Sequence, residues 1–214
     1  MLVGGDLGGP IIQDLALRFP GFARQLVLFN CPLPFDKRTM AGMETRAPRE
    51  ASDYFVRQGT DPDGLASELD SSTKRRRYVA SFHTSRFWAH PGAFLREADA
   101  TTAGRFSGSM AVDFHTEPFA DGDRFRAGLG CYESVFSAAA CSEPALMERN
   151  PNVRCLVLFG PSDHVVYPDF DRMAAVVFPD HVGPFLLRNC GHFLPWEAPG
   201  PLVSALAAFV GPRL

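Results

Sequence analysis

The sequence lacks several features that mark particular classes of protein. Its 214 residues contain no uncharged apolar run of about 18 residues, the minimum for a membrane-spanning helix. The first residues lack the charged and apolar regions of a signal peptide. Neither sign of charge is in large excess, because 21 Lys and Arg stand against 24 Asp and Glu, a formal net charge of −3. We therefore expect a cytoplasmic protein that binds neither nucleic acid nor a membrane.

The sequence also lacks the cysteine spacings of zinc sites and disulfide frameworks. Its five cysteines are odd in number and form no C-x-x-C pair, at Cys31, Cys131, Cys141, Cys155 and Cys190. This distribution predicts buried or free thiols in a reducing compartment. Because no ligand cluster is visible, we expect no metal ion and no organic cofactor.

Both ends of the chain alternate apolar strands with helices. Residues 1–34 contain a short apolar piece, a glycine turn, a helical pattern and an apolar strand over 25–30. Residues 151–214 contain an apolar strand over 154–159, a helix, a strand near 185–188 and a terminal helix. Strands that are apolar throughout and alternate with helices predict a parallel sheet with helices on both faces, an α/β fold.

Residues 35–150 differ from both ends. They are charged, helical in pattern, broken by Pro and Gly, and rich in Phe. We interpret them as a helical lid inserted between the two core segments 1–34 and 151–214.

A carboxylate lies at a glycine-rich turn near the start of the chain. In the segment LVGGDLGGP, Asp6 stands between two glycine pairs, after apolar residues and before a helix. Glycines allow a strand to turn sharply into a helix and expose the residue at the apex. Asp6 is therefore a candidate nucleophile, and the backbone N–H of Leu7 is a candidate oxyanion donor. The alternative is that Asp6 caps the helix or only closes the turn.

Two further candidates follow strands of the second core segment. Asp163 comes directly after the strand that ends at Gly160, and His192 follows the next strand in the segment NCGHFLPWE. A nucleophile, an acid and a histidine, each in a loop after a strand, is the chain order of α/β-hydrolases. Taken singly, each residue has an alternative interpretation. The alternative for Asp163 is an acid that only closes a turn, with Asp169 or Asp171 as the catalytic acid in its place. The alternative for His192 is an ordinary loop histidine.

At these motifs the sequence resembles the epoxide hydrolase and haloalkane dehalogenase branch of the α/β-hydrolase superfamily. The matching pieces are VGGDLGG, RQLVLFNCPLP, LVLFGPSDHVV and CGHFLPWEAP. The resemblance implies a nucleophile at Asp6, a supporting acid at Asp163 and a water-activating base at His192. It also implies an alkyl-enzyme ester as intermediate.

The resemblance extends to tyrosines of the lid, which in epoxide hydrolases bind and protonate the epoxide oxygen. Tyr132 stands where the second lid tyrosine is expected, and Tyr54 is a candidate for the first. Trp88 is a further candidate for contact with the substrate. The alternative for Tyr132 is a place in the aromatic core of the lid.

The expected partner is a small molecule, an epoxide or a similar electrophile, and the sequence leaves the oligomeric state open. One alternative is a haloalkane dehalogenase-like enzyme or another C–X hydrolase, although dehalogenases usually place Trp where this chain has Leu7. A second alternative is an inactive or binding relative of the fold.

Only five residues precede Asp6, whereas the family builds several strands before its nucleophile. The resemblance therefore implies an N-terminally truncated form whose partial parallel sheet begins at the nucleophile turn. Such a sheet has an unpaired edge and exposed apolar surface, which predicts poor solubility or low activity.

Overall fold

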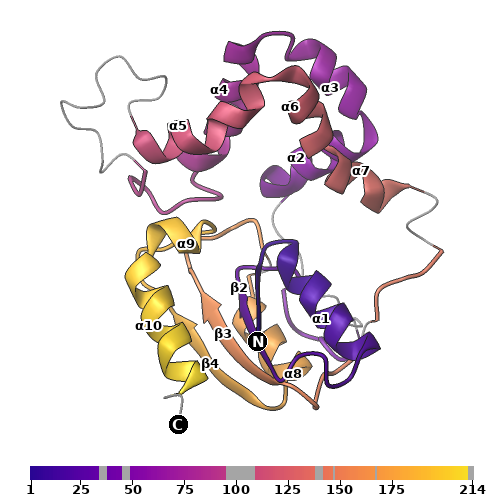
Figure 1. Ribbon diagram of the computed structural model, residues 1–214, viewed down its shortest axis with the longest axis vertical. Coiled ribbons are helices and arrows are strands. Elements are labelled where there is room, and N and C mark those ends of the chain that lie inside the picture. The colour runs from indigo at the N-terminus through magenta and orange to yellow at the C-terminus, as the bar shows by residue number, and fades with distance from the viewer. Residues whose placement is uncertain are drawn as a thin grey trace. The chain divides into compact units, whose positions relative to one another are not determined.

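The computed structural model describes residues 1–33, 38–44, 49–94, 109–137, 142–146, 148–166 and 168–211. They belong to two compact units (Figure 1). The first, here called the core unit, comprises Met1–Ala47 and Ala145–Leu214, and the second, the helical unit, comprises Pro48–Pro144. Within the described residues, no helix combines the length and the apolar character needed to cross a membrane.

A four-stranded parallel sheet forms the centre of the core unit. Its strands are β1 (Leu2–Gly5), β2 (Gln25–Phe29), β3 (Arg154–Phe159) and β4 (His181–Leu186), in the order β1-β2-β3-β4. The predicted parallel sheet and α/β class are confirmed. Because all four strands run the same way, the loops that follow them all leave from the same side of the sheet, at the carboxyl ends of the strands.

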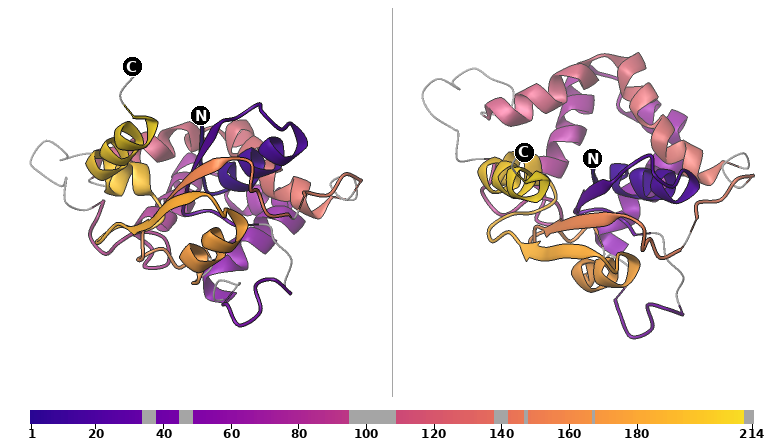
Figure 2. Two further views of the ribbon diagram at one scale, coloured as in Figure 1. Left: turned by 90° about the horizontal axis from the view of Figure 1, so that it is seen from below. Right: turned by 60° about the horizontal axis from the view of Figure 1, so that its bottom comes forward.

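Helices cover both faces of this sheet. Helices α1 (Gly8–Arg18) and α8 (Phe170–Val177) pack on one face, where alternate residues such as Leu28 and Val157 are buried. Helices α9 (Leu194–Glu197) and α10 (Pro199–Val210) pack on the other. Figure 2 shows the strands between α8 on one side and α10 on the other. Buried apolar residues on both faces of the central strands β2 and β3 thus produce a three-layer unit.

Strand β4 differs from the prediction, which placed it near 185–188. It spans His181–Leu186 and includes Gly183 and Pro184, residues that usually interrupt strands. Because β4 lies at the edge of the sheet and pairs only with β3, the N–H that proline lacks is not needed on the open side. A register shift between Leu156 and Leu158 of β3 accommodates the irregular strand.

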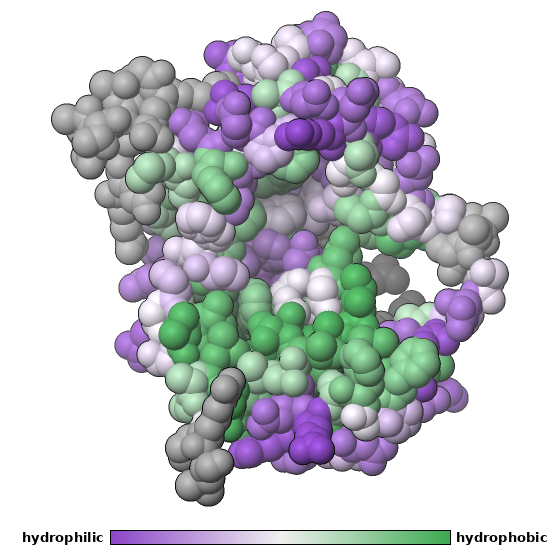
Figure 3. All heavy atoms as spheres, viewed as in Figure 1, coloured by the Kyte–Doolittle hydropathy of each residue, from purple (hydrophilic) through white to green (hydrophobic). Residues whose placement is uncertain are grey.

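Apolar side chains remain exposed around β1 and on α10. Strand β1 forms the other edge of the sheet, and Val3 on it is 44% exposed. Helix α10 contains no charged residue, and its Val203 is 63% exposed. Figure 3 shows apolar side chains gathered over this part of the core unit. The sheet therefore has an open edge with apolar surface beside it, and the poor solubility inferred from such features stays a prediction.

The helical unit contains six α-helices and one 3₁₀ helix within the described residues. They are α2 (Arg49–Thr60), α3 (Pro62–Glu68), α4 (Ser72–Thr84), α5 (Met110–Thr116), η2 (Glu117–Ala120), α6 (Gly122–Gly128) and α7 (Gly130–Phe136). Oxygen-bearing side chains cap four of the α-helices and accept a hydrogen bond from a first-turn N–H, at Asp61, Ser71, Ser109 and Asp121. These caps explain why polar segments broken by Pro and Gly still form helices.

Two histidines of α4 and α5 stack inside the helical unit. The ring centroids of His83 and His115 lie 5.1 Å apart with an interplanar angle of 24°, and Phe94 meets the His83 ring edge-on. Burial, with His115 as a second cause, lowers the pKa of His83 to about 4. Burial also lowers the pKa of His115. The folded helical unit therefore holds this pair in the neutral form at neutral pH.

We expect the helical unit to lose stability as the pH falls from 6.5 to 4. In the unfolded chain His83 binds a proton below about pH 6.5, whereas in the folded chain it binds one only below about pH 4. This difference lowers the free energy of unfolding by about 2 kcal/mol at pH 5. Urea unfolding followed by Trp88 fluorescence, in a Trp196→Phe background, measures it at pH 7 and pH 5.

The variant His83→Gln keeps a donor for the Val79 carbonyl but cannot titrate, so its stability should change less between these pH values. The control His181→Gln changes a histidine of the core unit and should retain the full loss. Equal losses in wild type and His83→Gln would refute the assignment.

Candidate functional site

Asp6 occupies a tight turn between β1 and α1. Its φ of +47° lies in the left-handed region, and its carbonyl accepts a hydrogen bond from the Gly9 N–H at 3.1 Å. A Cβ at Gly4 would lie 2.5 Å from the Gly8 carbonyl oxygen, so glycine is required where strand and helix meet. Helix α1 begins after Leu7 without a side-chain cap, so the alternative that Asp6 caps this helix is wrong.

Asp163 lies in the loop after β3 and is 3% exposed. Its Oδ1 accepts hydrogen bonds from the backbone N–H groups of Val165 at 2.8 Å and Val166 at 3.2 Å. The alternative acids make other contacts. Asp169 accepts hydrogen bonds from the Glu44 N–H and Arg172, and Asp171 accepts one from the Arg172 N–H.

His192 lies in the loop after β4, between the two acids. Its Nδ1–H donates to Asp163 Oδ2 at 2.8 Å, and its Nε2 is 3.7 Å from Asp6 Oδ2. The His192 side chain is 5% exposed, whereas the Asp6 side chain is 42% exposed. The structure thus brings together the three residues predicted from separate motifs, with the outermost carboxylate open to solvent.

Glu197 of α9 binds the loop that carries His192. Its two carboxylate oxygens accept hydrogen bonds from the Gly191 N–H at 2.9 Å and the Phe193 N–H at 3.0 Å. These N–H groups belong to the residues on either side of His192. The position of the imidazole is therefore fixed through the backbone as well as through Asp163.

The two carboxylates determine the charge of His192. Burial on its own would lower the pKa of the imidazole, but Asp163, and after it Asp6, more than offset this and raise the pKa to about 10. His192 is therefore protonated at neutral pH in the free protein. Both acids face a cation rather than a neutral ring.

Asn30, which the sequence analysis did not select, lies fully buried behind these residues. It follows β2 with a φ of +42°. Its Nδ2 donates to Asp163 Oδ2 at 2.8 Å and to the Gly191 carbonyl at 3.1 Å. Its position directly after an apolar strand, like that of Asp163, is the signal that could have identified it.

In the helical unit, Tyr54 of α2 and Tyr132 of α7 lie side by side. Their ring centroids are 5.9 Å apart at an interplanar angle of 81°. The close packing of α2 and α7 depends on Gly59, where a Cβ would lie 2.2 Å from the Phe136 ring and 2.9 Å from the Tyr132 carbonyl oxygen. The structure therefore pairs the two tyrosines that the sequence predicted separately.

Trp88 supports this pair from the interior of the helical unit. It is 7% exposed, and its ring centroid lies 4.9 Å from that of Tyr54 and 5.1 Å from that of Phe82. Its contacts with these two aromatic rings are packing contacts.

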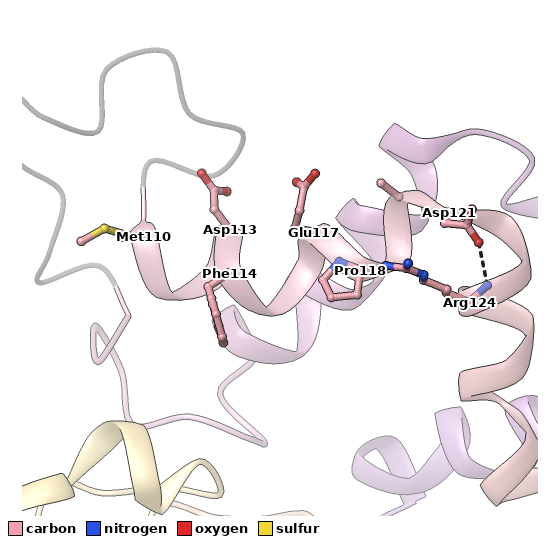
Figure 4. Close-up of a pocket in the computed structure, with 8 residues that line it drawn as sticks. Met110, Asp113, Phe114, Glu117, Pro118, Asp121 and Arg124 are labelled. Carbon is pink, nitrogen blue, oxygen red and sulfur yellow. Dashed lines mark hydrogen bonds between the residues drawn. The ribbon is translucent and has the colours of Figure 1, made fainter.

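A separate hollow of about 780 Å³ lies on the helical unit along α5, η2 and α6. Figure 4 shows Asp113 and Glu117 on one side of the helix and Phe114 on the other. Both acids form ion pairs with Arg76. These two acids of the hollow are therefore already paired with a cation of the helical unit. Nowhere in the described part of the chain do three His, Cys, Asp or Glu side chains gather as metal ligands would.

The four cysteines among the described residues are free thiols. Cys31, Cys155 and Cys190 are buried, and burial raises the pKa of Cys190 to about 12. Cys131 is exposed, and Cys141 lies outside the described residues. The buried thiols are therefore poor nucleophiles.

Solved structures with the same fold are numerous, although their sequences are distant. A variant of an epoxide hydrolase from Bacillus megaterium, in complex with its diol product, matches with a TM-score of 0.62 and 14% identity over 98% of this chain and 68% of its own. The Cif epoxide hydrolase from Acinetobacter nosocomialis matches with a TM-score of 0.62 and 14% identity over 98% and 60%. An esterase from Rhodococcus matches with a TM-score of 0.56 and 20% identity over 98% and 64%.

These matches show that the chain has the α/β-hydrolase fold. The chain spans about two thirds of the length of each of these proteins. No protein-family model and no curated protein matches the sequence.

The raised pKa of His192 should respond to each carboxylate in turn. Because Asp163 contributes more than Asp6, we expect the pKa to fall in Asp6→Asn and to fall further in Asp163→Asn. Titration of the ¹⁵N-labelled imidazole by NMR between pH 5 and pH 11 measures the change. Asp169→Asn, which removes an acid that does not contact His192, is the control. A pKa of His192 that does not change in Asp6→Asn would show that the Asp6 carboxylate does not act on the imidazole.

Proposed function

We propose that this protein is a hydrolase that opens epoxides to vicinal diols through an aspartate nucleophile. The observation that carries the proposal is the line of three side chains, Asp163, His192 and Asp6, at the carboxyl ends of the strands. Asp163 Oδ2 lies 2.8 Å from His192 Nδ1, and His192 Nε2 lies 3.7 Å from Asp6 Oδ2. A nucleophile, a base and an acid that orients the base are the groups needed to form and hydrolyse a covalent ester.

In the first step, a carboxylate oxygen of Asp6 attacks a carbon of the epoxide. The C–O bond of the ring breaks, and its electron pair goes to the epoxide oxygen. Tyr132 donates a proton to that oxygen, with Tyr54 as its neighbour. The ring centroids of the two tyrosines are 5.9 Å apart, so Tyr54 packs beside the proposed proton donor. The product is an alkyl ester on Asp6.

In the second step, water attacks the ester carbonyl of Asp6. His192 takes the proton of the water, and Asp163 stabilises the imidazolium and its tautomer. The backbone N–H of Leu7, at the start of α1, donates to the tetrahedral oxyanion. Collapse of this intermediate breaks the bond to the diol, whose oxygen takes the hydroxyl proton of the intermediate, and restores the carboxylate, which keeps an oxygen from water. The Tyr132 phenolate left by the first step regains its proton from solvent.

The charge of His192 fits this order of steps. The imidazolium of the free protein cannot accept a proton from water. Formation of the ester removes the negative charge of Asp6, which is one cause of the raised pKa. Formation of the ester therefore lowers the pKa of His192, and release of its proton to solvent leaves a neutral imidazole that can accept a proton from the attacking water.

The comparisons support a hydrolase acting on a small molecule. Epoxide hydrolases and an esterase share the fold, and one of the former holds a diol product. An esterase would need a nucleophile that attacks an acyl carbon, usually a hydroxyl, and this chain has the Asp6 carboxylate at the turn. The carboxylate favours attack on an alkyl carbon.

Dehalogenation uses the same carboxylate chemistry and is the second candidate reaction. Halide release from haloalkanes, measured beside diol formation from epoxides, distinguishes the two. A protein that only binds such molecules would give neither product.

We expect water-derived oxygen to accumulate in Asp6. During turnover of an epoxide in ¹⁸O-labelled water, hydrolysis of the ester leaves a labelled oxygen on the carboxylate. Mass spectrometry of the peptide that contains residue 6 measures the label. Asp6→Asn should show no label and no turnover, with analysis of fresh protein to exclude reversion by deamidation.

Direct attack of water on the epoxide would label the diol alone and leave Asp6 unlabelled in the wild type. That result would rule out the covalent mechanism. Full activity of Asp6→Asn without reversion would do the same.

We expect Tyr132→Phe to lower kcat by about 100-fold or more, because a general acid contributes about that factor. Tyr54→Phe should lower kcat by a smaller factor. Steady-state diol formation measures both. Tyr78→Phe is the matched control, because the Tyr78 hydroxyl is already bonded to Gln58 at 2.9 Å within the helical unit. An unchanged kcat in Tyr132→Phe would exclude it as the proton donor.

A further inference from the structure

We propose that Asn30 is a positioning residue that holds the nucleophile, the acid and the histidine loop in one arrangement. The inference rests on the proposed function, and it adds a residue to which neither the resemblance nor the matching structures assign a role. Asn30 touches no reacting atom. It acts through Asp163, Asp6 and the peptide group before His192.

The side chain of Asn30 contacts two of the three loops. Its Nδ2 donates to Asp163 Oδ2 at 2.8 Å, the same oxygen that accepts from His192, and to the Gly191 carbonyl at 3.1 Å. Its Oδ1 accepts from the Gly160 N–H at 3.0 Å. One amide group thus fixes the acid, the end of β3 and the residue before His192 relative to one another.

The backbone of Asn30 contacts the third loop. Its carbonyl accepts a hydrogen bond from the Asp6 N–H at 3.0 Å. Asp6 has a φ of +47°, in the left-handed region that L residues adopt rarely, and this hydrogen bond helps to hold it there. Asn30 therefore supports the strained turn of the nucleophile while its side chain orients the acid.

Few residues satisfy these contacts together. The φ of +42° favours Gly, Asn and Asp. Glycine lacks the side chain, and an ionised aspartate accepts hydrogen bonds but cannot donate to Asp163. Asparagine provides both a donor and an acceptor in this conformation.

The test compares Asn30→Gly and Asn30→Asp with the wild type by NMR of the ¹⁵N-labelled protein. Asn30→Gly keeps the backbone conformation and removes the side chain. We expect loss of the His192 Nδ1–H resonance at neutral pH, because Asp163 is no longer held against the ring. The matched control is Asn150→Gly, which changes another buried asparagine of the core unit that contacts none of the three loops. It should retain the resonance.

Asn30→Asp separates a positioning role from simple packing. At high pH the introduced carboxylate repels Asp163, and the Nδ1–H resonance should be lost. As the pH falls, the introduced carboxyl takes up a proton and can donate it to Asp163 Oδ2, so the resonance should return. Asn30→Gly should show no such return. A pH-independent effect of the same size in both variants would overturn the proposal.

A measurement on the wild type does not depend on how the variants fold. The Asn30 side-chain amide resonances should shift with the titration of His192, since both bind one carboxylate oxygen. Amide resonances that stay constant through this titration would overturn the proposal.

Kinetics provide the last comparison. With an epoxide that the wild type turns over, Asn30→Gly should lower kcat by on the order of 10- to 100-fold, the loss of one hydrogen bond to a charged group, with KM little changed. A raised KM at constant kcat would contradict a positioning role. The NMR results need no substrate, so they decide the role of Asn30 even where epoxide hydrolysis is not found.

Discussion

Four hydrogen bonds converge on the buried carboxylate of Asp163. A buried charge is costly unless donors and an opposite charge surround it. The donors are the N–H groups of Val165 and Val166, the amide of Asn30 and the imidazole of His192. They come from the loops that follow β2, β3 and β4. Because the carboxylate needs all of them, segments more than 100 residues apart in sequence are held in one arrangement.

Much of this arrangement could be predicted from sequence, and the reason is the parallel sheet. Apolar strands followed by polar loops predicted that Asp6, Asp163 and His192 meet at one edge. Asn30 obeys the same rule but was missed, because an asparagine after a strand is as common in ordinary turns as in sites. Strand β4 was misplaced because its Gly-Pro pair, tolerated at a sheet edge, resembles a turn. The pairing of the two tyrosines depends on a close helix contact at one glycine, for which the sequence contains no motif.

Two buried histidines illustrate how charged neighbours decide whether burial keeps an imidazole neutral. Burial lowers the pKa of both His83 and His192. His83 has an aromatic ring and a second histidine beside it, and its hydrogen bond to the Val79 carbonyl offsets burial only in part, so the ring is neutral. His192 has two carboxylates beside it, and they reverse the effect. The same residue type is therefore a neutral packing element in one unit and a cation in the other.

The proposed nucleophile is also one of the acids that keep His192 charged, and this double role distinguishes an aspartate from a serine at the turn. A serine is neutral before it reacts, so its histidine must be a base from the start. A carboxylate attacks without first giving a proton to a base, so the neighbour of Asp6 can remain protonated until the ester forms. The loss of the Asp6 charge then leaves Asp163 as the single carboxylate on the ring. The strength of the base is thereby linked to the presence of the intermediate that it must hydrolyse.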